Sequence, residues 1–187
     1  TTPFLTEVSN SHGIAYKPVE DDFVDYNIQA TLPHKLSQYG PGIAVGDIDG
    51  NGFDDFYVGG SSSYLGAFFM QDAKGKFTKD ADRLLQTEDA LVEDMGVLFF
   101  DADGDKDLDM YAVSGSYELP PANEICQDRL YLNNGKGKFV RAINALPTEA
   151  VNGSCVRAAD MDGDGDLDLF IGGRVVSGSY PAAPQSF

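Results

Sequence analysis

Oxygen-bearing side chains recur in three short segments with the same internal spacing. In each segment they occupy the first, third, fifth and ninth positions. These positions hold Asp47, Asp49, Asn51 and Asp55; Asp101, Asp103, Asp105 and Asp109; and Asp160, Asp162, Asp164 and Asp168. Alternate side chains of a tightly curved loop can point towards one centre, where so many carboxylates repel one another unless a cation lies among them. The spacing therefore predicts three cation-binding loops.

The remaining positions of these loops indicate which cation is bound. The seventh position is Phe53, Asp107 and Asp166. Phe53 has no ligating side chain, so this position is expected to contribute its backbone carbonyl. Glycine at the fourth position, in Gly50, Gly104 and Gly163, allows the sharp turn. An all-oxygen ligand set of this size favours Ca²⁺ over Mg²⁺ and argues against Zn²⁺ and Cu²⁺, so we expect three Ca²⁺ sites.

The loops begin like those of EF-hands but do not continue like them. An EF-hand loop ends on a bidentate Glu at position 12 and is flanked by helices. Position 12 here is Val58, Ala112 and Ile171. The residues after each loop are rich in β-branched and aromatic side chains, as in 56–60, 110–113 and 169–173. Each loop is therefore predicted to join two strands.

The loops start at residues 47, 101 and 160, and this long period indicates a propeller or an array. An apolar strand is predicted before each loop (42–46, 96–100, 155–159) and a second one after it. A third is predicted at 67–70 and 129–132, and a fourth follows a Gly-rich turn at 75–78 and 137–140. Four antiparallel strands per unit are typical of a propeller blade. The predicted fold is all-β, a partial β-propeller of four-stranded antiparallel blades with Ca-binding hairpin loops, in which the first two strands of each unit are buried on both faces.

This reading divides the chain into an N-terminal strand and surface segment (1–40) and three units (41–94, 95–150 and 151–187). Residues 4–8 resemble a fourth strand without a blade of its own, and the third unit stops where its third strand should begin. A propeller typically needs four or more blades. The chain is therefore expected to be a fragment of a longer protein, or an open stack whose edges must pair with something.

Composition excludes several classes of partner. The 187 residues include 13 Lys and Arg against 30 Asp and Glu, a net charge of −17. Nucleic acids and anionic membranes are bound through Lys and Arg, so neither is an expected partner. The longest apolar run, residues 96–100, is far shorter than the ~20 residues that span a bilayer. No transmembrane segment is expected.

Few other side chains suggest chemistry. Cys126 and Cys155 could form a disulfide, or Cys155 could be a small buried strand residue and Cys126 a free thiol. His12 and His34 lie in loop-like segments, each as a general base or as a solvated or structural histidine. Tyr117 and Tyr180, in long loops between outer strands, could stack on sugar rings or simply pack. No catalytic residue and no organic cofactor site is predicted.

The loop-plus-strand motif continues as Phe-Tyr-Val-Gly-Gly (56–60) and Leu-Phe-Ile-Gly-Gly (169–173), and residues 130–139 read Leu-Tyr-Leu-Asn-Asn-Gly-Lys-Gly-Lys-Phe. These motifs resemble the FG-GAP/VCBS-type repeat family, which includes integrin α-subunit propellers and bacterial proteins with an ASPIC/UnbV domain. The resemblance covers about residues 40 to 187. It implies a Ca²⁺-stabilised propeller outside the cytoplasm, extracellular, periplasmic or at the cell surface, used for adhesion or ligand binding and without implied catalysis.

We therefore expect a non-catalytic, extracytoplasmic Ca²⁺-binding module that recognises a protein or carbohydrate ligand. One alternative is a polysaccharide lyase or hydrolase built on a Ca²⁺ propeller, which would need basic and His residues converging in one cleft. Its basic candidates are Arg129, Arg157 and Arg174. Another is an assembly module that self-associates, or pairs with another chain, through open blade edges.

Overall fold

The computed structural model describes residues 4–80, 83, 87–121 and 123–187. Over these residues the chain is all-β, with short 3₁₀ turns and no α-helix. The 3₁₀ turns are η1 (Ser9–His12), η2 (Asp25–Asn27), η3 (Thr87–Leu91) and η4 (Glu124–Cys126). No helix in the described part of the chain is long and apolar enough to cross a membrane.

The strands form two four-stranded antiparallel sheets and a hairpin, and each sheet follows the order of its strands in the sequence. The first sheet contains β1 (Ile43–Gly46), β2 (Asp55–Val58), β3 (Ala67–Gln71) and β4 (Phe77–Asp80). The second contains β5 (Glu93–Phe100), β6 (Asp109–Gly115), β7 (Arg129–Leu132) and β8 (Val140–Arg141). The hairpin pairs β9 (Gly153–Ala159) with β10 (Asp168–Gly173). The strands predicted between residues 42 and 173 are confirmed to within three residues at each end, and the arrangement is that of partial propeller blades.

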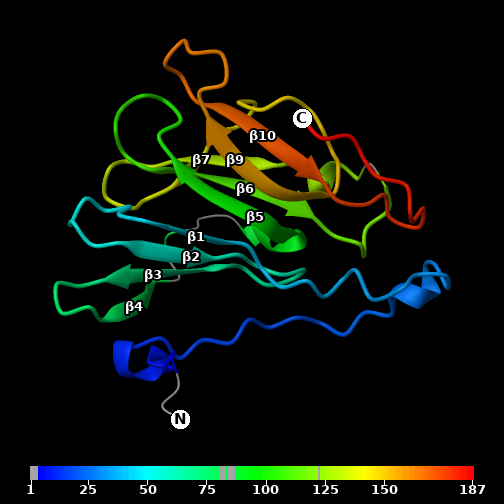
Figure 1. Cartoon of the computed structure of the whole chain (residues 1–187), viewed down its shortest axis with the longest axis horizontal. Coiled ribbons are helices and arrows are strands. Elements are labelled where there is room, and N and C mark those ends of the chain that lie inside the picture. The colour runs from blue at the N-terminus through cyan, green and yellow to red at the C-terminus, as the bar shows by residue number, and fades with distance from the viewer. Residues whose placement is uncertain (1–3, 81–82, 84–86, 122) are drawn as a thin grey trace.

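The three units stack face to face in chain order (Figure 1). Between the two sheets lies a core that includes Ala44, Tyr57, Phe68, Met110 and Phe139. A second core between the second sheet and the hairpin includes Tyr111, Val113, Val156 and Ile171. Apolar burial between neighbouring units therefore holds the stack together.

The prediction that the inner strands are buried on both faces holds only in the middle of the stack. Every residue of β6 is buried, because units lie on both sides of it. Ile43 and Val45 of β1 are each 62 % exposed, and Phe170 of β10 is 48 % exposed. The two end units each have one neighbour, so the prediction is wrong for their outer faces.

Successive units approach most closely where their first strands begin. A Cβ added to Gly42 would lie 3.1 Å from the Cα of Gly96, and one added to Gly96 would lie 2.9 Å from the Cα of Cys155. Backbone therefore meets backbone there, which explains glycine at the two positions that have a following unit. Cys155 is exposed in this structure, so its expected burial is wrong.

Residues 4–8, expected to be a strand, form none. The N-terminal segment instead runs along the outer face of the first sheet (Figure 1), where Ile14 and Tyr16 pack against the cluster of Val58, Ala67 and Phe69. The N-terminal segment covers the half of this face that lies away from β1, and the outer side chains of β1 stay exposed.

A buried ion pair within the second sheet also contacts the first. The guanidinium of Arg129 donates to the Asp94 carboxylate at 2.5 Å, and both side chains are at most 5 % exposed. The same carboxylate accepts hydrogen bonds from the Tyr57 hydroxyl at 2.6 Å and the Gly60 amide at 2.7 Å. One aspartate of β5 therefore connects the first sheet to β7 of the second.

Candidate metal centres

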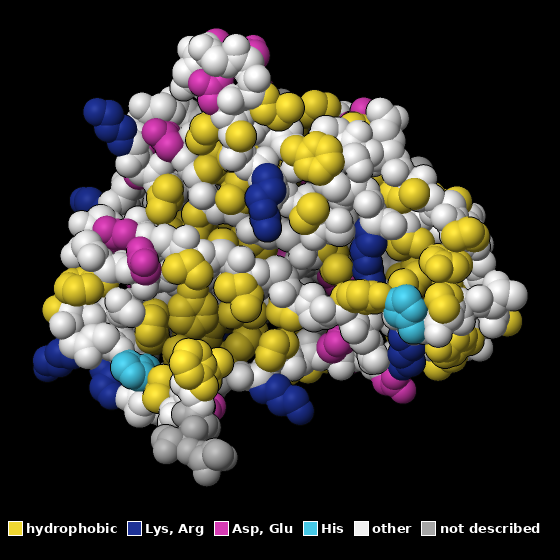
Figure 2. Space-filling view, viewed as in Figure 1, with side chains coloured by type: hydrophobic (Ala, Val, Ile, Leu, Met, Phe, Trp, Pro, Cys, Tyr) yellow, Lys and Arg dark blue, Asp and Glu magenta, His cyan; other side chains and the backbone are white. Residues whose placement is uncertain are grey.

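The three acidic loops project from the same end of the stack, one from each inner hairpin (Figure 1). Asp and Glu side chains gather along that edge of the surface (Figure 2). In each loop, the carboxylates of the first, third and ninth positions offer ligand atoms within 4.8 Å of one another. The triads are Asp47, Asp49 and Asp55; Asp101, Asp103 and Asp109; and Asp160, Asp162 and Asp168.

The carboxylate at the first position closes each loop through backbone amides. In the first loop, Asp47 accepts from the amides of Asn51 (3.0 Å) and Gly52 (2.8 Å). Asp101 accepts from Gly104 and Lys106, and Asp160 accepts from Gly163 and Gly165. The fourth-position glycines have φ between 73° and 82°, a left-handed conformation that glycine adopts at little cost, so the predicted sharp turn is confirmed.

The carboxylate at the ninth position lies at the base of each loop. Asp109 accepts from the Ala102 amide at 2.8 Å and from the Asn133 amide, just beyond β7, at 2.8 Å. Asp55 is held in the same way by the amides of Ile48 and Gln71. Asp168 accepts from the Met161 amide alone among the described residues. Two of the three triads are therefore fixed by a third strand.

The side chains at the fifth position lie outside the triads. Asn51, Asp105 and Asp164 each accept a hydrogen bond from the amide of the seventh position, at 2.8 to 3.0 Å. That amide belongs to Phe53, Asp107 and Asp166. The roles of the fifth-position side chains and of the seventh-position carbonyls as ligands stay predictions, as do the individual roles of the triad residues.

Burial and charge repulsion make these loops suitable for a cation. Burial raises the pKa of the Asp55 and Asp109 carboxyls above the usual range. Burial, reinforced by Asp105 and Asp109, raises the pKa of Asp107 to about 6. Asp107 Oδ1 is buried and has no hydrogen-bond donor among the described residues. A cation would lower the free energy of every one of these carboxylates, so the residues present fit a hard divalent ion.

The comparison with known families adds to this geometry. Residues 121–171 match the FG-GAP-like repeat family. This stretch is an FG-GAP-like repeat. It runs from the approach to β7 through β10 and includes the third acidic loop. No curated protein matches the chain. The repeat carries an Asp triad of the same geometry as those of the two loops before it, and the boundaries of the three units stay predictions.

The residues that support these loops from the outer strands were not predicted from the sequence. Asn133 follows β7 of the FG-GAP-like repeat, and its amide nitrogen Nδ2 donates to the carbonyls of Ile48 (2.8 Å) and Leu108 (3.1 Å). It therefore connects the loops of the first two units. Aligning residues 70–77 with 132–139 places Gln71 and Asn133 at the same position, which would have indicated that both support the loop of their own unit but not that Asn133 connects two loops.

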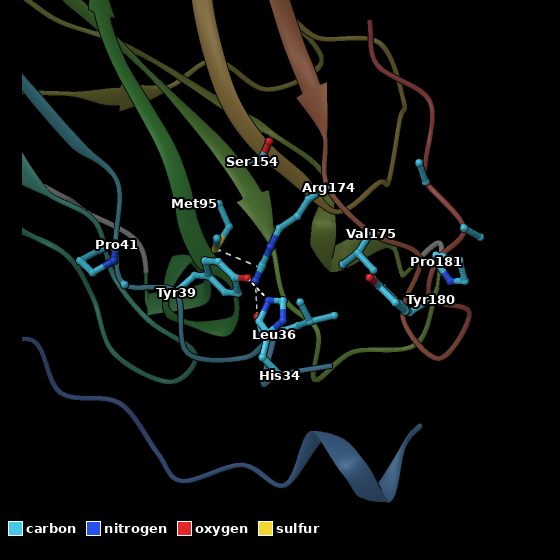
Figure 3. A pocket seen from close by; sticks show the side chains of 13 residues that line it. His34, Leu36, Tyr39, Pro41, Met95, Ser154, Arg174, Val175, Tyr180 and Pro181 are labelled. Atoms are coloured by element: carbon cyan, nitrogen blue, oxygen red, sulfur yellow. Dashed lines mark hydrogen bonds between the residues drawn. The ribbon is translucent and has the colours of Figure 1, made fainter. Parts of the chain in front are cut away.

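A second candidate site lies at the opposite end of the inner strands, where a cavity of about 550 Å³ opens (Figure 3). His34, Tyr39, Arg174 and Tyr180 line it. The Arg174 guanidinium lies 4.4 Å from the Tyr39 ring centroid and donates to the Leu36 carbonyl. Burial lowers the pKa of Arg174 from its usual range. Among the described residues no carboxylate forms a salt bridge with it, so the cavity presents a guanidinium stacked on one aromatic ring. Tyr180 lines the cavity, whereas Tyr117 is fully buried.

The other residues singled out from the sequence lie elsewhere. Cys126 and Cys155 are both free thiols, so the disulfide is not formed. Arg129 is already paired with Asp94, and Arg157 lies on the exposed face of the hairpin. His12 bonds to the Gly75 carbonyl through Nδ1 at 2.7 Å, which is a structural role.

Proposed function

We propose that the chain is a calcium-stabilised FG-GAP-type scaffold that works outside the cytoplasm and recognises a protein or carbohydrate ligand. The observation that carries the proposal is the threefold recurrence of one Asp triad, in which the first-position carboxylate accepts each time from the amide of the sixth position. A single acidic turn could be a solvated surface feature, but three turns built alike indicate a shared ligand. Free Ca²⁺ outside cells fills even weak sites of ~10⁻⁴–10⁻³ M.

In this proposal calcium is structural. Each ion holds together the two inner strands of a unit, which carboxylate repulsion would otherwise push apart. Ligand recognition is assigned to the opposite end of the strands, where the 550 Å³ cavity carries Tyr39, Tyr180 and Arg174. Separating the two ends lets the loops keep a common sequence while the other end varies.

Thermal unfolding after treatment with EDTA tests the structural role of calcium. Added Ca²⁺ is expected to raise the melting temperature far more than Mg²⁺ does, because an ion that binds only the folded state stabilises it by ~2.7 kcal/mol per site at 100 times its dissociation constant. Asp101→Asn should reduce the response, whereas Glu149→Gln, a matched loss of charge outside the loops, should leave it unchanged. Absence of any Ca²⁺ response, with metal analysis also empty, contradicts the proposal.

One observation favours the alternative of a polysaccharide lyase or hydrolase. His34 and Arg174 line the same cavity, and His34 Nε2 contacts the Tyr39 hydroxyl. A cation and a proton-transferring pair in one cleft are what such a reaction needs. Release of shorter products from acidic polysaccharides, abolished by His34→Ala but retained by His12→Ala, would establish the enzyme. The absence of cleavage across a panel of such polymers would leave the recognition scaffold as the better account.

A further inference from the structure

Glu93 and Asp94, the first two residues of β5, are both at most 5 % exposed, but their carboxylates are in different situations. The oxygens of Asp94 accept from Tyr57, Gly60 and Arg129. Glu93 Oε1 is buried, and no donor among the described residues lies within hydrogen-bond distance of it. A buried carboxylate oxygen without a donor is destabilising, so a rearrangement that gives the Glu93 carboxylate a donor from outside the chain would be favoured.

A second cavity lies beside Glu93, and we call it the Glu93 cavity. Its volume is about 240 Å³, and Met95 and Pro41 line both it and the 550 Å³ cavity of Figure 3. Pro18, Pro41 and Met95 give it apolar walls, and Glu20 lies at its lining together with Glu93. The cavity is smaller than the ~300–1,000 Å³ typical of drug-sized ligands. It therefore suits a slender group with a hydrocarbon stem.

We propose that the Glu93 cavity binds a primary alkylammonium group, supplied by a free diamine or by a lysine side chain of a partner protein. The ammonium would donate to the Glu93 carboxylate, whose side chain must turn towards the cavity because Oε1 is buried in this structure, and its methylene stem would lie against Met95 and the two prolines. The Ser61 hydroxyl, which also lines the cavity, donates to the Val19 carbonyl and so keeps lone pairs that can accept a second ammonium hydrogen.

The geometry favours an ammonium over other cations. The described carboxylates that lie close enough together to hold a metal ion are those of the three loops, and Glu93 is not among them. A guanidinium binds best in a bidentate manner or on an aromatic face, and the lining of the Glu93 cavity contains no aromatic ring. An ammonium is a compact charge that needs few acceptors, and the net charge of −17 attracts it.

Binding is expected to depend on pH through Glu93. Burial raises the pKa of this carboxyl to about 8, with Glu118, Glu20 and Asp25 adding to the effect and Arg174 opposing it. At pH 7 the free carboxyl therefore holds a proton, which passes to solvent when the ammonium binds. Affinity should rise about tenfold per pH unit between pH 6 and about 8, where the ammonium itself remains charged.

The test is a titration of the ¹⁵N-labelled chain with pentane-1,5-diamine and, separately, with Nα-acetyl-lysine methylamide, followed through the amides of Gly59 and Gly60, which line the cavity. Nα-acetyl-norleucine methylamide, which lacks the ammonium, is the matched neutral ligand. Both amines are expected to shift these two amides, and norleucine is not. Preference for the diamine or for the lysine derivative identifies the source of the group.

Glu93→Gln should weaken amine binding by at least about tenfold and remove its pH dependence. Glu149→Gln, with the same loss of charge elsewhere, should bind like the parent chain, and melting curves verify that both variants fold. Unchanged binding by Glu93→Gln, or no shift of the Gly59 and Gly60 amides, overturns the proposal. The titration is run with and without added Ca²⁺, so a failure of the calcium proposal is seen separately.

Discussion

The two ends of the inner strands use carboxylates in opposite ways. At the loop end, one arrangement recurs three times, and each first-position carboxylate is held by backbone amides of its own loop. At the other end, Glu93, Asp94 and Arg129 occur once, and their contacts join different units. The repeated end tolerates sequence variation between its ligand positions, whereas the other end depends on individual side chains. Single substitutions are therefore expected to reduce stability more at the end that carries Glu93, Asp94 and Arg129.

Replacing Arg129 by Met should produce the largest loss. It would leave the buried carboxylates of Asp94 and Asp89 without their common cation, and breaking a buried pair in this way costs about 3–5 kcal/mol. Urea unfolding measures the change. Arg157→Met, on the exposed face of the hairpin, should stay within about 0.5 kcal/mol. Equal effects of the two substitutions would show that the buried ion pair of Arg129 stabilises the chain no more than an exposed arginine does.

The pH dependence of stability should reveal Glu93. Its pKa of about 8 lies above the ordinary value of 4.5, so between these values the folded chain binds more protons than the unfolded one. The free energy of unfolding should therefore fall as pH rises from about 5 to 8, by about 2–4 kcal/mol in amine-free buffer. Glu93→Gln should lack this contribution and exceed the parent chain in stability at pH 8. A parallel pH profile for the two proteins would contradict the prediction.

Within the loop end, the second and third loops should differ. Asp109→Ala removes the acceptor of two backbone amides at a buried position and should cost about 1–3 kcal/mol without metal. Asp168 is exposed and holds one such amide among the described residues, so Asp168→Ala should cost less. Chemical unfolding in EDTA compares the two. A larger loss for Asp168→Ala would show that the third strand does not stabilise the triad.

Substitution of Lys106 has the smallest expected effect on stability. It occupies the sixth position of the second loop with φ of 77°, where the other two loops have Gly52 and Gly165. Lys106→Gly should stabilise the chain by about 0.5–1 kcal/mol, because glycine adopts this conformation without the steric penalty of a side chain. Gly165→Ala should act in the opposite direction. Thermal melts of both variants in EDTA measure the difference.

The loop end could be predicted because it repeats. Ligand positions, turns and the strands on either side recur with one spacing, so each copy supports the reading of the others. The three acidic loops therefore carried most of the information in the sequence. Outer strands were located equally well, but the role of Asn133 as a bridge between two loops was not, since it depends on how units stack.

The other end could not be predicted from a single sequence. The cavity residues Tyr39, Met95 and Arg174 come from three separate segments and share no motif. Glu93 and Asp94 are adjacent acids, and nothing in the sequence distinguishes them. In the structure both Asp94 oxygens accept hydrogen bonds, whereas Glu93 Oε1 has no donor among the described residues. Side-chain exposure in the first and last units also depends on the neighbouring units. Phe170 and Cys155 are exposed because a unit lies on only one side of them in this structure.

The sequential order of strands in each sheet has a consequence for how the chain folds during synthesis. Every pairing in the first sheet is made by residue 80, so its short loops can close before the second sheet exists. The Tyr57 hydroxyl, however, acquires its acceptor only when Asp94 has emerged, and that charge is neutralised only when Arg129 follows. The first sheet is therefore expected to form early but to become resistant to hydrogen exchange only together with the second.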